Sequence, residues 1–338
     1  MALAAEPETR GRGDDVMRHL HELIALIPPS MRPPGERPRL DCSAAPSVDA
    51  DGGDRHVIHE LGLLVPEVGD LASRAAIEAI MSHPHTAAVR KLTIARSFEA
   101  WPRPADLDFG WVLATLADLG RPAQLTSLFV TEQGPTVMDA VGRFASRPRA
   151  LTTYNSLTRF GAGLFPGVEI LDLRDSDVEW ACEPNAFPDL TTLILRPRGP
   201  GRIGAGWAKA LFDRPEVFPH LRELRGPEGH GDQLLELLLD APALAGRLGV
   251  LDFTNALTNR GAMLLCEGAP LLANVEELWV ATTSERRDGL TRMARDAKSA
   301  TELPPLGQLE ITDDWRNRLR QRFGRRLRLA TRPSHPGL

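Results

Sequence analysis

The sequence has few cysteines, few aromatic residues and no long apolar run. Its three cysteines, Cys42, Cys182 and Cys266, lie far apart, so they predict neither a disulfide framework nor a paired metal site. Aromatic residues make up 5% of the chain, so aliphatic side chains must build most of the core. No apolar segment approaches the roughly 20 residues that cross a bilayer, and residues 1–15 lack the apolar region of a signal peptide. These absences predict a soluble, reduced, cytoplasmic protein without a membrane partner.

Charge of neither sign dominates the composition. The net charge of -5 over 338 residues gives no general argument for nucleic acid or an anionic membrane as a partner. The hydrophobic fraction of 42% and the charged fraction of 25% are ordinary for a globular protein. The length allows one elongated domain or two compact ones.

The first 86 residues differ from the rest of the chain. Apolar residues at helical spacing from Val16 to Ile27 predict a helix, which two prolines then end. The stretch Pro28–Asp54 is rich in Pro, Gly, Asp and Ser and predicts a linker or an irregular arm. A second helix is expected from Asp70 to Met81, with three side chains facing inward: Leu71, Ala75 and Ile77.

From residue 89 onward one pattern recurs, L-x-x-L-x-L with Val, Ile or Phe at some positions. Its eight occurrences begin at Val89, Leu125, Val168, Leu190, Leu221, Leu248, Val275 and Leu306. The start-to-start spacings of 36, 43, 22, 31, 27, 27 and 31 residues are typical of repeat architectures. The longest spacing leaves room for a degenerate repeat near Leu151–Leu157. Helices are expected between the strands at Gly206–Phe212, Asp232–Leu239, Gly261–Glu267 and Asp288–Ala297.

The strands contain polar pairs, which argue against a doubly wound α/β sheet. These pairs are Arg90-Lys91, Thr126-Ser127, Thr191-Thr192, Arg222-Glu223 and Glu276-Glu277. A sheet covered by helices on both sides needs nearly continuous apolar strands, and burying an unpaired charge costs several kcal/mol. The pairs therefore predict one sheet face open to water, as in a curved solenoid whose helices lie on the other face.

The segment Leu257–Val280 resembles a leucine-rich repeat of the ribonuclease-inhibitor-like class, as found in bacterial proteins. The resemblance covers roughly residues 89–329 and implies an α/β horseshoe with parallel strands on the concave face and helices on the convex face. The Arg-rich segment Trp315–Leu329 is similar to the helix and final strand that close such proteins. One departure is the missing column of Asn after the third Leu, which predicts irregular curvature.

This organisation divides the chain into three parts. They are an N-terminal helical extension or cap with a Pro-rich linker (1–86), a leucine-rich-repeat domain (87–312) and a C-terminal capping helix, strand and Arg-rich tail (313–338). The N-terminal part is expected to cover the core of the first repeat.

The positions between the second and third Leu are expected to project from the concave face. Aromatic and Arg anchors are typical of protein interfaces, and Trp279 and Arg225 are the expected anchors here. With flanking positions, the predicted partner-binding residues are Phe129, Asp172, Arg174, Ile194, Arg196, Arg225, Asp252 and Trp279. An alternative is that the N-terminal arm or a long loop covers the two aromatics.

Three further patterns resemble ligand-binding motifs. Gly199–Gly204 matches G-x-G-x-x-G, but Pro200 removes a backbone donor and the preceding strand is polar, so a repeat turn is favoured. The C-terminal arginines suggest phosphate contacts, yet Trp315, Leu319 and Phe323 form one stripe and favour a capping helix over Asp313–Phe323. The histidines His19, His21, His56, His59, His83 and His85 do not reproduce a metal-binding spacing.

The sequence therefore predicts a non-catalytic scaffold or adaptor that binds a protein or peptide. It predicts no catalytic residue, cofactor or metal, and nucleic acid is not the expected partner. One alternative is a regulator of a partner enzyme, such as a GTPase activator, with Arg174 and Arg198 as candidate residues. Another is recognition of a phosphate or nucleic-acid ligand through Arg196, Arg198, Arg202 and the C-terminal arginines.

Overall fold

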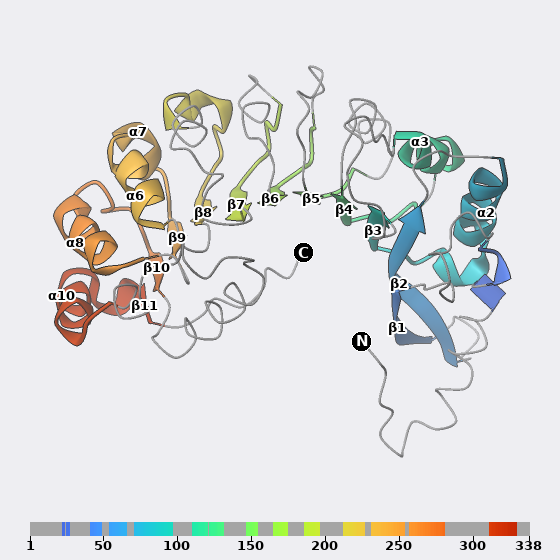
Figure 1. The fold of residues 1–338 in the computed structure, drawn as a ribbon, viewed down its shortest axis with the longest axis horizontal. Helices are drawn as coiled ribbons and strands as arrows, with labels where there is room; N and C mark the ends of the chain where they lie inside the picture. Colours follow the sequence, from blue (N-terminus) through green and yellow to red (C-terminus); the bar gives the residue numbers. More distant parts are fainter. Residues whose placement is uncertain are drawn as a thin grey trace, which may run out of the picture. The chain divides into compact units, whose positions relative to one another are not determined.

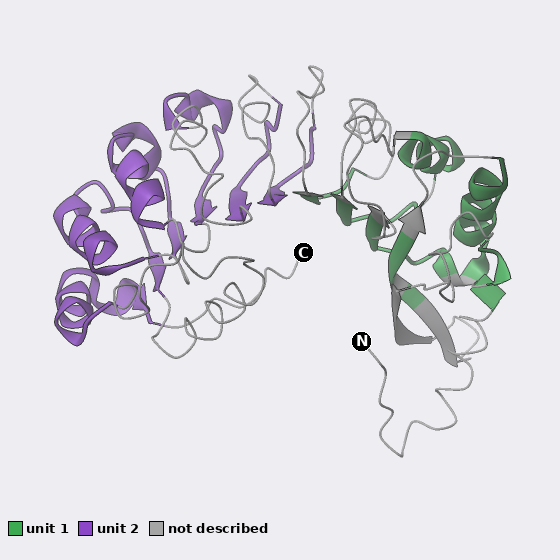
Figure 2. Cartoon of the chain, in the orientation of Figure 1, with its two compact units in different colours: residues 1–163 green, residues 164–338 purple. Residues whose placement is uncertain are grey.

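The structure is a computed structural model of the chain. It describes residues 22–23, 25–27, 41–48, 54–65, 71–96, 110–120, 122–131, 147–154, 165–174, 186–196, 212–226, 231–253, 257–280 and 311–329. The chain forms two compact units, residues 1–163 and 164–338, which Figure 2 colours separately.

Unit 1 begins with an antiparallel pair of strands and continues as a parallel sheet. Its strands are β1 (Asp41–Val48), β2 (Asp54–Val65), β3 (Lys91–Arg96), β4 (Ser127–Thr131) and β5 (Ala150–Tyr154). Its helices are α2 (Leu71–Ser82), the 3-10 turn η3 (Pro84–Thr86) and α3 (Gly110–Leu119). β1 runs antiparallel to β2, and each later strand lies parallel beside the strand before it. The degenerate repeat expected near Leu151 is confirmed as β5.

The N-terminal hairpin corrects one prediction. The sequence predicts an irregular arm over Pro28–Asp54, but β1 lies within that segment and pairs along its whole length with β2. β2 in turn extends the parallel sheet beside β3, which gives β1 the role of an edge strand. Proline is tolerated at a sheet edge, so Pro46 and the polar composition of β1 are compatible with a strand.

The helix α2 is confirmed, but its buried stripe is rotated from the predicted one. Leu71 is 86% exposed and Ala75 is also exposed, whereas Ile77 is buried as expected. The inward side chains recur at three- and four-residue steps and are Ser73, Ala76, Ile77, Ile80 and Met81. In the described part of the first predicted helix, Leu23 and Ile27 are buried.

Unit 2 is built from parallel strands whose spatial order follows the chain. Its strands are β6 (Ile170–Arg174), β7 (Thr192–Arg196), β8 (Glu223–Arg225), β9 (Val250–Phe253), β10 (Glu277–Val280) and β11 (Leu327–Arg328). Its helices are the 3-10 turn η5 (Pro215–Val217), α6 (Gly231–Leu239), α7 (Pro242–Ala245), α8 (Asn259–Gly268), α10 (Asp313–Phe323) and the 3-10 turn η7 (Gly324–Arg326). In this unit α6, α8 and α10 lie on one side of the strands (Figure 1). Parallel strands in chain order with helices on one side of them are typical of a repeat-type α/β fold.

The recurring leucines supply the core between strands and helices. The second and third apolar positions of each pattern are nearly inaccessible to solvent: Leu171, Leu173, Leu193, Leu195, Leu224, Leu251, Phe253, Leu278 and Val280. Because successive residues of a strand point to opposite sides, the residues between them form a second, separate face. The predicted helices over Asp232–Leu239 and Gly261–Glu267 are confirmed as α6 and α8. Residues 206–211 and 288–297 of the other two predicted helices lie outside the described residues.

A short turn motif, F-P-x-[VL], introduces three of the strands. Its phenylalanines, Phe165, Phe187 and Phe218, are all buried. In each copy the N–H of the Val or Leu that ends the motif donates to the phenylalanine carbonyl at 3.3 Å. Phe165 and Phe187 also stack with ring centroids 5.0 Å apart, which joins neighbouring repeats through the core.

A backbone hydrogen-bond ladder links each repeat to the next. One carbonyl just before a strand accepts two N–H groups from the corresponding place in the following repeat. The accepting carbonyls in unit 2 are those of Glu169, Thr191, Arg222 and Gly249. Thr191 adds a side-chain bond from Oγ1 to the Glu169 carbonyl at 3.1 Å. The repeats are therefore joined by backbone bonds that do not depend on an Asn column.

In one repeat the third position of the leucine pattern is Gly226, which has no side chain to fill the core. The ring of Phe253, from the next repeat, lies there instead. A Cβ atom at Gly226 would lie 2.9 Å from Cδ1 of Phe253 and 3.3 Å from Cδ2 of Leu234. Phe253 is itself fully buried, so its ring fills the space that a leucine at position 226 would occupy.

The predicted helix over Asp313–Phe323 is confirmed as α10, and β11 is the closing strand expected within Trp315–Leu329, whereas Ile311 of the eighth leucine pattern is not in a strand. α10 lies against α8 and buries Leu319 and Phe323, while Trp315 is half-buried. The sheet neighbour of β10 is β11, with Leu278 opposite Leu327. The prediction that Ile311 belongs to the next strand is therefore wrong: it precedes α10, where the Thr312 N–H donates to Oδ1 of Asn259. Residues 306–310 of that strand lie outside the described residues.

Within the described parts of the chain, no helix has the length and apolar character needed to cross a membrane.

Candidate functional site

The strand side chains that point away from the core leucines form what we call the strand face of unit 2. It consists of Ile170, Asp172, Arg174, Thr192, Ile194, Arg196, Glu223, Arg225, Val250, Asp252, Glu277 and Trp279. Seven of the eight residues predicted to bind a partner belong to this face. The register places Asp172, Ile194, Arg225, Asp252 and Trp279 opposite one another on five adjacent strands.

Most of this row is buried, contrary to the expectation that it faces water. Asp172 is fully inaccessible, and Ile194, Arg225 and Asp252 are also buried. Adjacent strands are only about 4.8 Å apart, so neighbouring side chains shield one another. Burial of an unpaired charge is costly, but the charged side chains on this face pair with each other and can therefore be buried.

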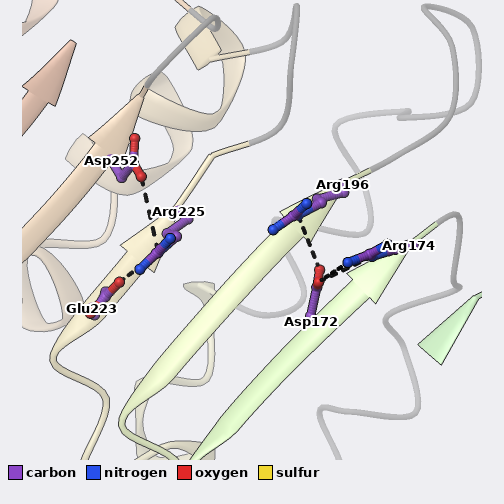
Figure 3. Close-up of polar contacts among 6 residues, drawn as sticks. All are labelled: Asp172, Arg174, Arg196, Glu223, Arg225 and Asp252. Carbon is purple, nitrogen blue, oxygen red and sulfur yellow. Dashed lines mark hydrogen bonds and ion pairs between the residues drawn. The ribbon is translucent and has the colours of Figure 1, made fainter. Parts of the chain in front are cut away.

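The first group of paired charges, the β6–β7 cluster, comprises Asp172, Arg174 and Arg196 (Figure 3). Arg174 donates from Nε and Nη2 to Oδ2 of Asp172, at 3.1 and 2.9 Å. Nε of Arg196 lies 3.4 Å from Oδ1 of the same carboxylate. That oxygen is buried and accepts no hydrogen bond in the structure. The side chains of Arg174 and Arg196 remain 33% and 47% exposed above the buried carboxylate.

The second group, the β8–β9 cluster, comprises Glu223, Arg225 and Asp252 (Figure 3). Nε of Arg225 donates to Oε1 of Glu223 at 2.6 Å and lies 4.0 Å from Oδ2 of Asp252. All three side chains are about nine-tenths buried. Charge-assisted bonds of this kind fix side-chain geometry within a packed surface, so Arg225 is held in place.

Trp279 is the half-buried aromatic residue of the strand face. Its indole Nε1–H donates to Oε2 of Glu277 at 3.0 Å, two residues earlier on β10. The bond fixes the ring orientation while part of the ring stays accessible, which suits an interface anchor.

Phe129, the eighth predicted residue, lies on β4 in unit 1. It is half-buried, with Thr93 and Thr152 opposite it on the adjacent strands. It therefore belongs to a different unit from Trp279, and the candidate site is restricted to unit 2.

A second surface feature of unit 2 is a groove of about 520 Å³ between α8 and α10. It is lined by Met263, Cys266, Glu267, Trp315, Arg318, Gln321 and Arg322. Burial raises the pKa of the Cys266 thiol, and the opposing charges of Arg322 and Arg318 do not cancel this effect. The thiol is therefore protonated at neutral pH, which does not suit a nucleophile.

Among the described residues, the other sequence patterns do not form a metal-binding site. No group of three His, Cys, Asp or Glu side chains there is arranged to hold a metal ion. His56 and His59 lie on strand β2 rather than on a helix. His19, His21, Arg198, Arg202 and Gly199–Gly204 lie outside the described residues. The absence of catalysis and of cofactors remains a prediction.

The pairing partners Glu223 and Glu277 were missed from the sequence. Both stand two residues before their partners, in Glu223-Leu224-Arg225 and Glu277-Leu278-Trp279. Residues i and i+2 of a strand share a face. An acidic residue two positions before an Arg or Trp in a strand therefore predicts a hydrogen bond or ion pair between the two side chains. Asp172 and Arg174 have the same spacing.

No protein-family model matches the sequence, and the comparison with curated proteins found no match. The chain is similar to a Bacteroides fragilis protein whose crystal structure was determined by a structural-genomics consortium. The match has 17% identity and a TM-score of 0.47, and it covers 69% of this chain and 73% of that one. So distant a likeness supports no inference about this chain.

Proposed function

We propose that the chain is a leucine-rich-repeat protein of the ribonuclease-inhibitor-like class, with a horseshoe of strands and helices. Three features support this: parallel strands ordered as in the chain, helices on one side of them in unit 2, and leucines at regular strand positions. The repeated backbone ladder and the F-P-x-[VL] turns add further internal similarity.

The proposed function is that of a non-catalytic scaffold or adaptor whose strand face binds a protein or peptide partner. One observation carries the proposal. The strand face presents three accessible anchors, Arg174, Arg196 and Trp279, and each is held by a hydrogen bond or ion pair to a carboxylate on the same face. Side chains fixed before binding lose little conformational entropy when a partner arrives, and Arg and Trp are enriched at interface hot spots.

The experiment is affinity capture from the native host with the full chain, followed by mass spectrometry. The double variant Arg196→Ala/Trp279→Ala removes two accessible anchors while leaving Asp172 and Arg225 in place. The matched control, Leu271→Ala/Arg320→Gln, changes two exposed residues outside the strand face. The proposal predicts a partner that the parent and the control recover and the double variant loses. Recovery of the same proteins by all three chains would refute it.

The alternative functions stay predictions from the sequence. Regulation of a partner enzyme is compatible with the same binding face. Phosphate recognition through Arg198 and Arg202 depends on residues outside those described.

A further inference from the structure

Two neighbouring helix pairs of unit 2, α6 with α8 and α8 with α10, differ in the polar contacts between them. In the first pair, Asp232 of α6 accepts a hydrogen bond from the Thr258 N–H at 2.9 Å, just before α8 begins. Arg260 of α8 also forms an ion pair with Glu236 of α6. These contacts bridge α6 and α8 with charged side chains that are matched.

The second pair, α8 and α10, is joined at its start and open beyond it. The Thr312 N–H donates to Oδ1 of Asn259 at 2.8 Å, which links the beginnings of the two helices. The groove of about 520 Å³ lies between the same helices, and Glu267 of α8 and Arg322 of α10 both line it. Both side chains are exposed, and neither forms an ion pair with any residue that the structure describes. The groove therefore keeps charged groups that a partner can reach.

The lining of the groove has the composition of a small protein interface. Three of its residues are half-buried and apolar, namely Met263, Cys266 and Trp315. Four are exposed and polar, namely Glu267, Arg318, Gln321 and Arg322. The guanidinium group of Arg318 lies 4.8 Å from the centroid of the Trp315 ring, so the rim and the apolar centre are in contact. An apolar centre with a polar rim is the usual anatomy of an interface.

The cap at this groove is positive, whereas the rest of unit 2 is negative. Residues 313–328 contain seven arginines and two aspartates, a formal charge of +5. Residues 164–312 contain 23 acidic and 15 basic residues, a formal charge of -8. Arg318 and Arg322 stand four positions apart on α10, where like charges destabilise a helix. Covering the last repeat requires the buried side chains of α10, so capping does not account for this pair of arginines.

We propose that the groove between α8 and α10 binds an acidic amphipathic helix of a partner protein. The apolar stripe of that helix packs on Met263 and Trp315, and its acidic side chains pair with Arg318 and Arg322, as in other helix-in-groove complexes. The groove is separate from the strand face, so this site goes beyond the proposed scaffold function and adds a second binding surface to it.

A helix fits this surface better than a long polyanion does. A phosphate backbone pairs with arginines but leaves the apolar centre of the groove unused. A nucleic acid or an anionic membrane also extends past the cap, toward the part of unit 2 whose formal charge is -8. An acidic helix about as long as α10, which has 11 residues, is confined to the cap and covers the apolar side chains as well.

The test is selection of a helical-peptide display library on the immobilised full chain, followed by fluorescence anisotropy with the selected peptides. The library keeps an apolar stripe and varies the flanking positions among acidic, basic and neutral residues. We expect acidic residues to be enriched and Arg322→Glu to weaken binding at least about tenfold. Arg320→Glu is the matched control, because Arg320 is exposed on α10 but does not line the groove. The control should bind as the parent does.

A reversed charge separates a direct contact from a structural effect. Selection of the same library on Arg322→Glu should enrich basic flanking residues in place of acidic ones, which a loosened cap does not produce. Hydroxyl-radical footprinting of the parent should show that the peptide protects Trp315 and leaves the oxidation of Trp279 unchanged. The strand-face variant Arg196→Ala/Trp279→Ala should bind the peptide as the parent does, which keeps this test independent of the proposed function.

Several results would overturn the helix-binding groove. They are selection of no peptide, no enrichment of acidic residues, equal binding to Arg322→Glu, or protection of Trp279 in place of Trp315. A single-stranded DNA that displaces the peptide from the parent and does not bind Arg322→Glu would assign the groove to nucleic acid instead. A dimer of the parent that Arg322→Glu dissociates, measured by analytical ultracentrifugation, would make a second copy of the chain the occupant.

Discussion

Asp172 shows how a charged side chain is accommodated within a strand of unit 2. It is fully buried, and two arginines supply the opposite charge. Breaking a fully buried ion pair by removing one partner costs about 3–5 kcal/mol, but the arginines here are partly exposed, so solvent screens part of that cost. The carboxylate therefore stabilises unit 2 as well as orienting Arg174 and Arg196.

Asp172→Asn should lower the free energy of unfolding by about 1–3 kcal/mol, because two guanidinium groups then lose their common counter-charge. Chemical denaturation of the full chain measures the effect. Asp314→Asn is the matched control, since Asp314 is exposed and pairs with Arg318 at the surface. If Asp314→Asn lowers the free energy of unfolding as much as Asp172→Asn does, the buried carboxylate contributes no more than an exposed one, which would contradict this account.

Gly226 packs closely against Phe253 of the next repeat. Gly226→Ala brings a methyl group to within 2.9 Å of the Phe253 ring, and overpacking a core costs about 1–3 kcal/mol. The companion change Phe253→Leu should restore part of this loss, so the two substitutions should be non-additive. A double-mutant cycle by urea unfolding tests the pair, and simple additivity would show that the ring does not occupy this space.

At the scale of elements, the F-P-x-[VL] turns set the start of three strands. Phe187→Ala removes a fully buried ring that stacks on Phe165, and the expected loss of stability is about 3–5 kcal/mol. Leu271→Ala, at a 39% exposed position, should cost less than about 1 kcal/mol. Thermal unfolding of both variants compares them. Similar losses at the two positions would mean that the turn motif does not anchor the repeats.

Cys266 lies in the groove between α8 and α10, so the reactivity of its thiol depends on how these helices pack. Because burial raises the pKa of its thiol above the ordinary value, the thiolate fraction at any given pH is smaller than that of a free thiol. Alkylation by iodoacetamide, followed by peptide mass spectrometry, should therefore be slow at neutral pH and accelerate at a higher pH than alkylation of a free thiol does. Labelling of Cys266 at neutral pH as fast as that of N-acetylcysteine would contradict the burial of this thiol.

At the scale of the whole molecule, the repeated elements were predictable and the contacts between repeats were not. Periodic leucines placed seven strands, and the stripe of Leu319 and Phe323 placed the cap. The hairpin of β1 and β2 was missed because Pro and Asp normally indicate loops, while an edge strand tolerates both. The seven unit 2 candidates were correctly assigned to one face, but their burial depends on cross-strand pairing, which the spacing of single strands does not reveal.

The central claim is that the strand face of unit 2 binds a protein or peptide partner. Hydroxyl-radical footprinting of the full chain, alone and with the partner recovered by capture, tests it most directly. Trp279 lies on the strand face, and Trp315 lies in the groove between α8 and α10, so the two indoles report on different surfaces of one unit. The account predicts that partner binding lowers the oxidation of Trp279 severalfold and leaves Trp315 unchanged. Equal oxidation of Trp279 with and without the partner, or protection of Trp315 instead, would contradict it.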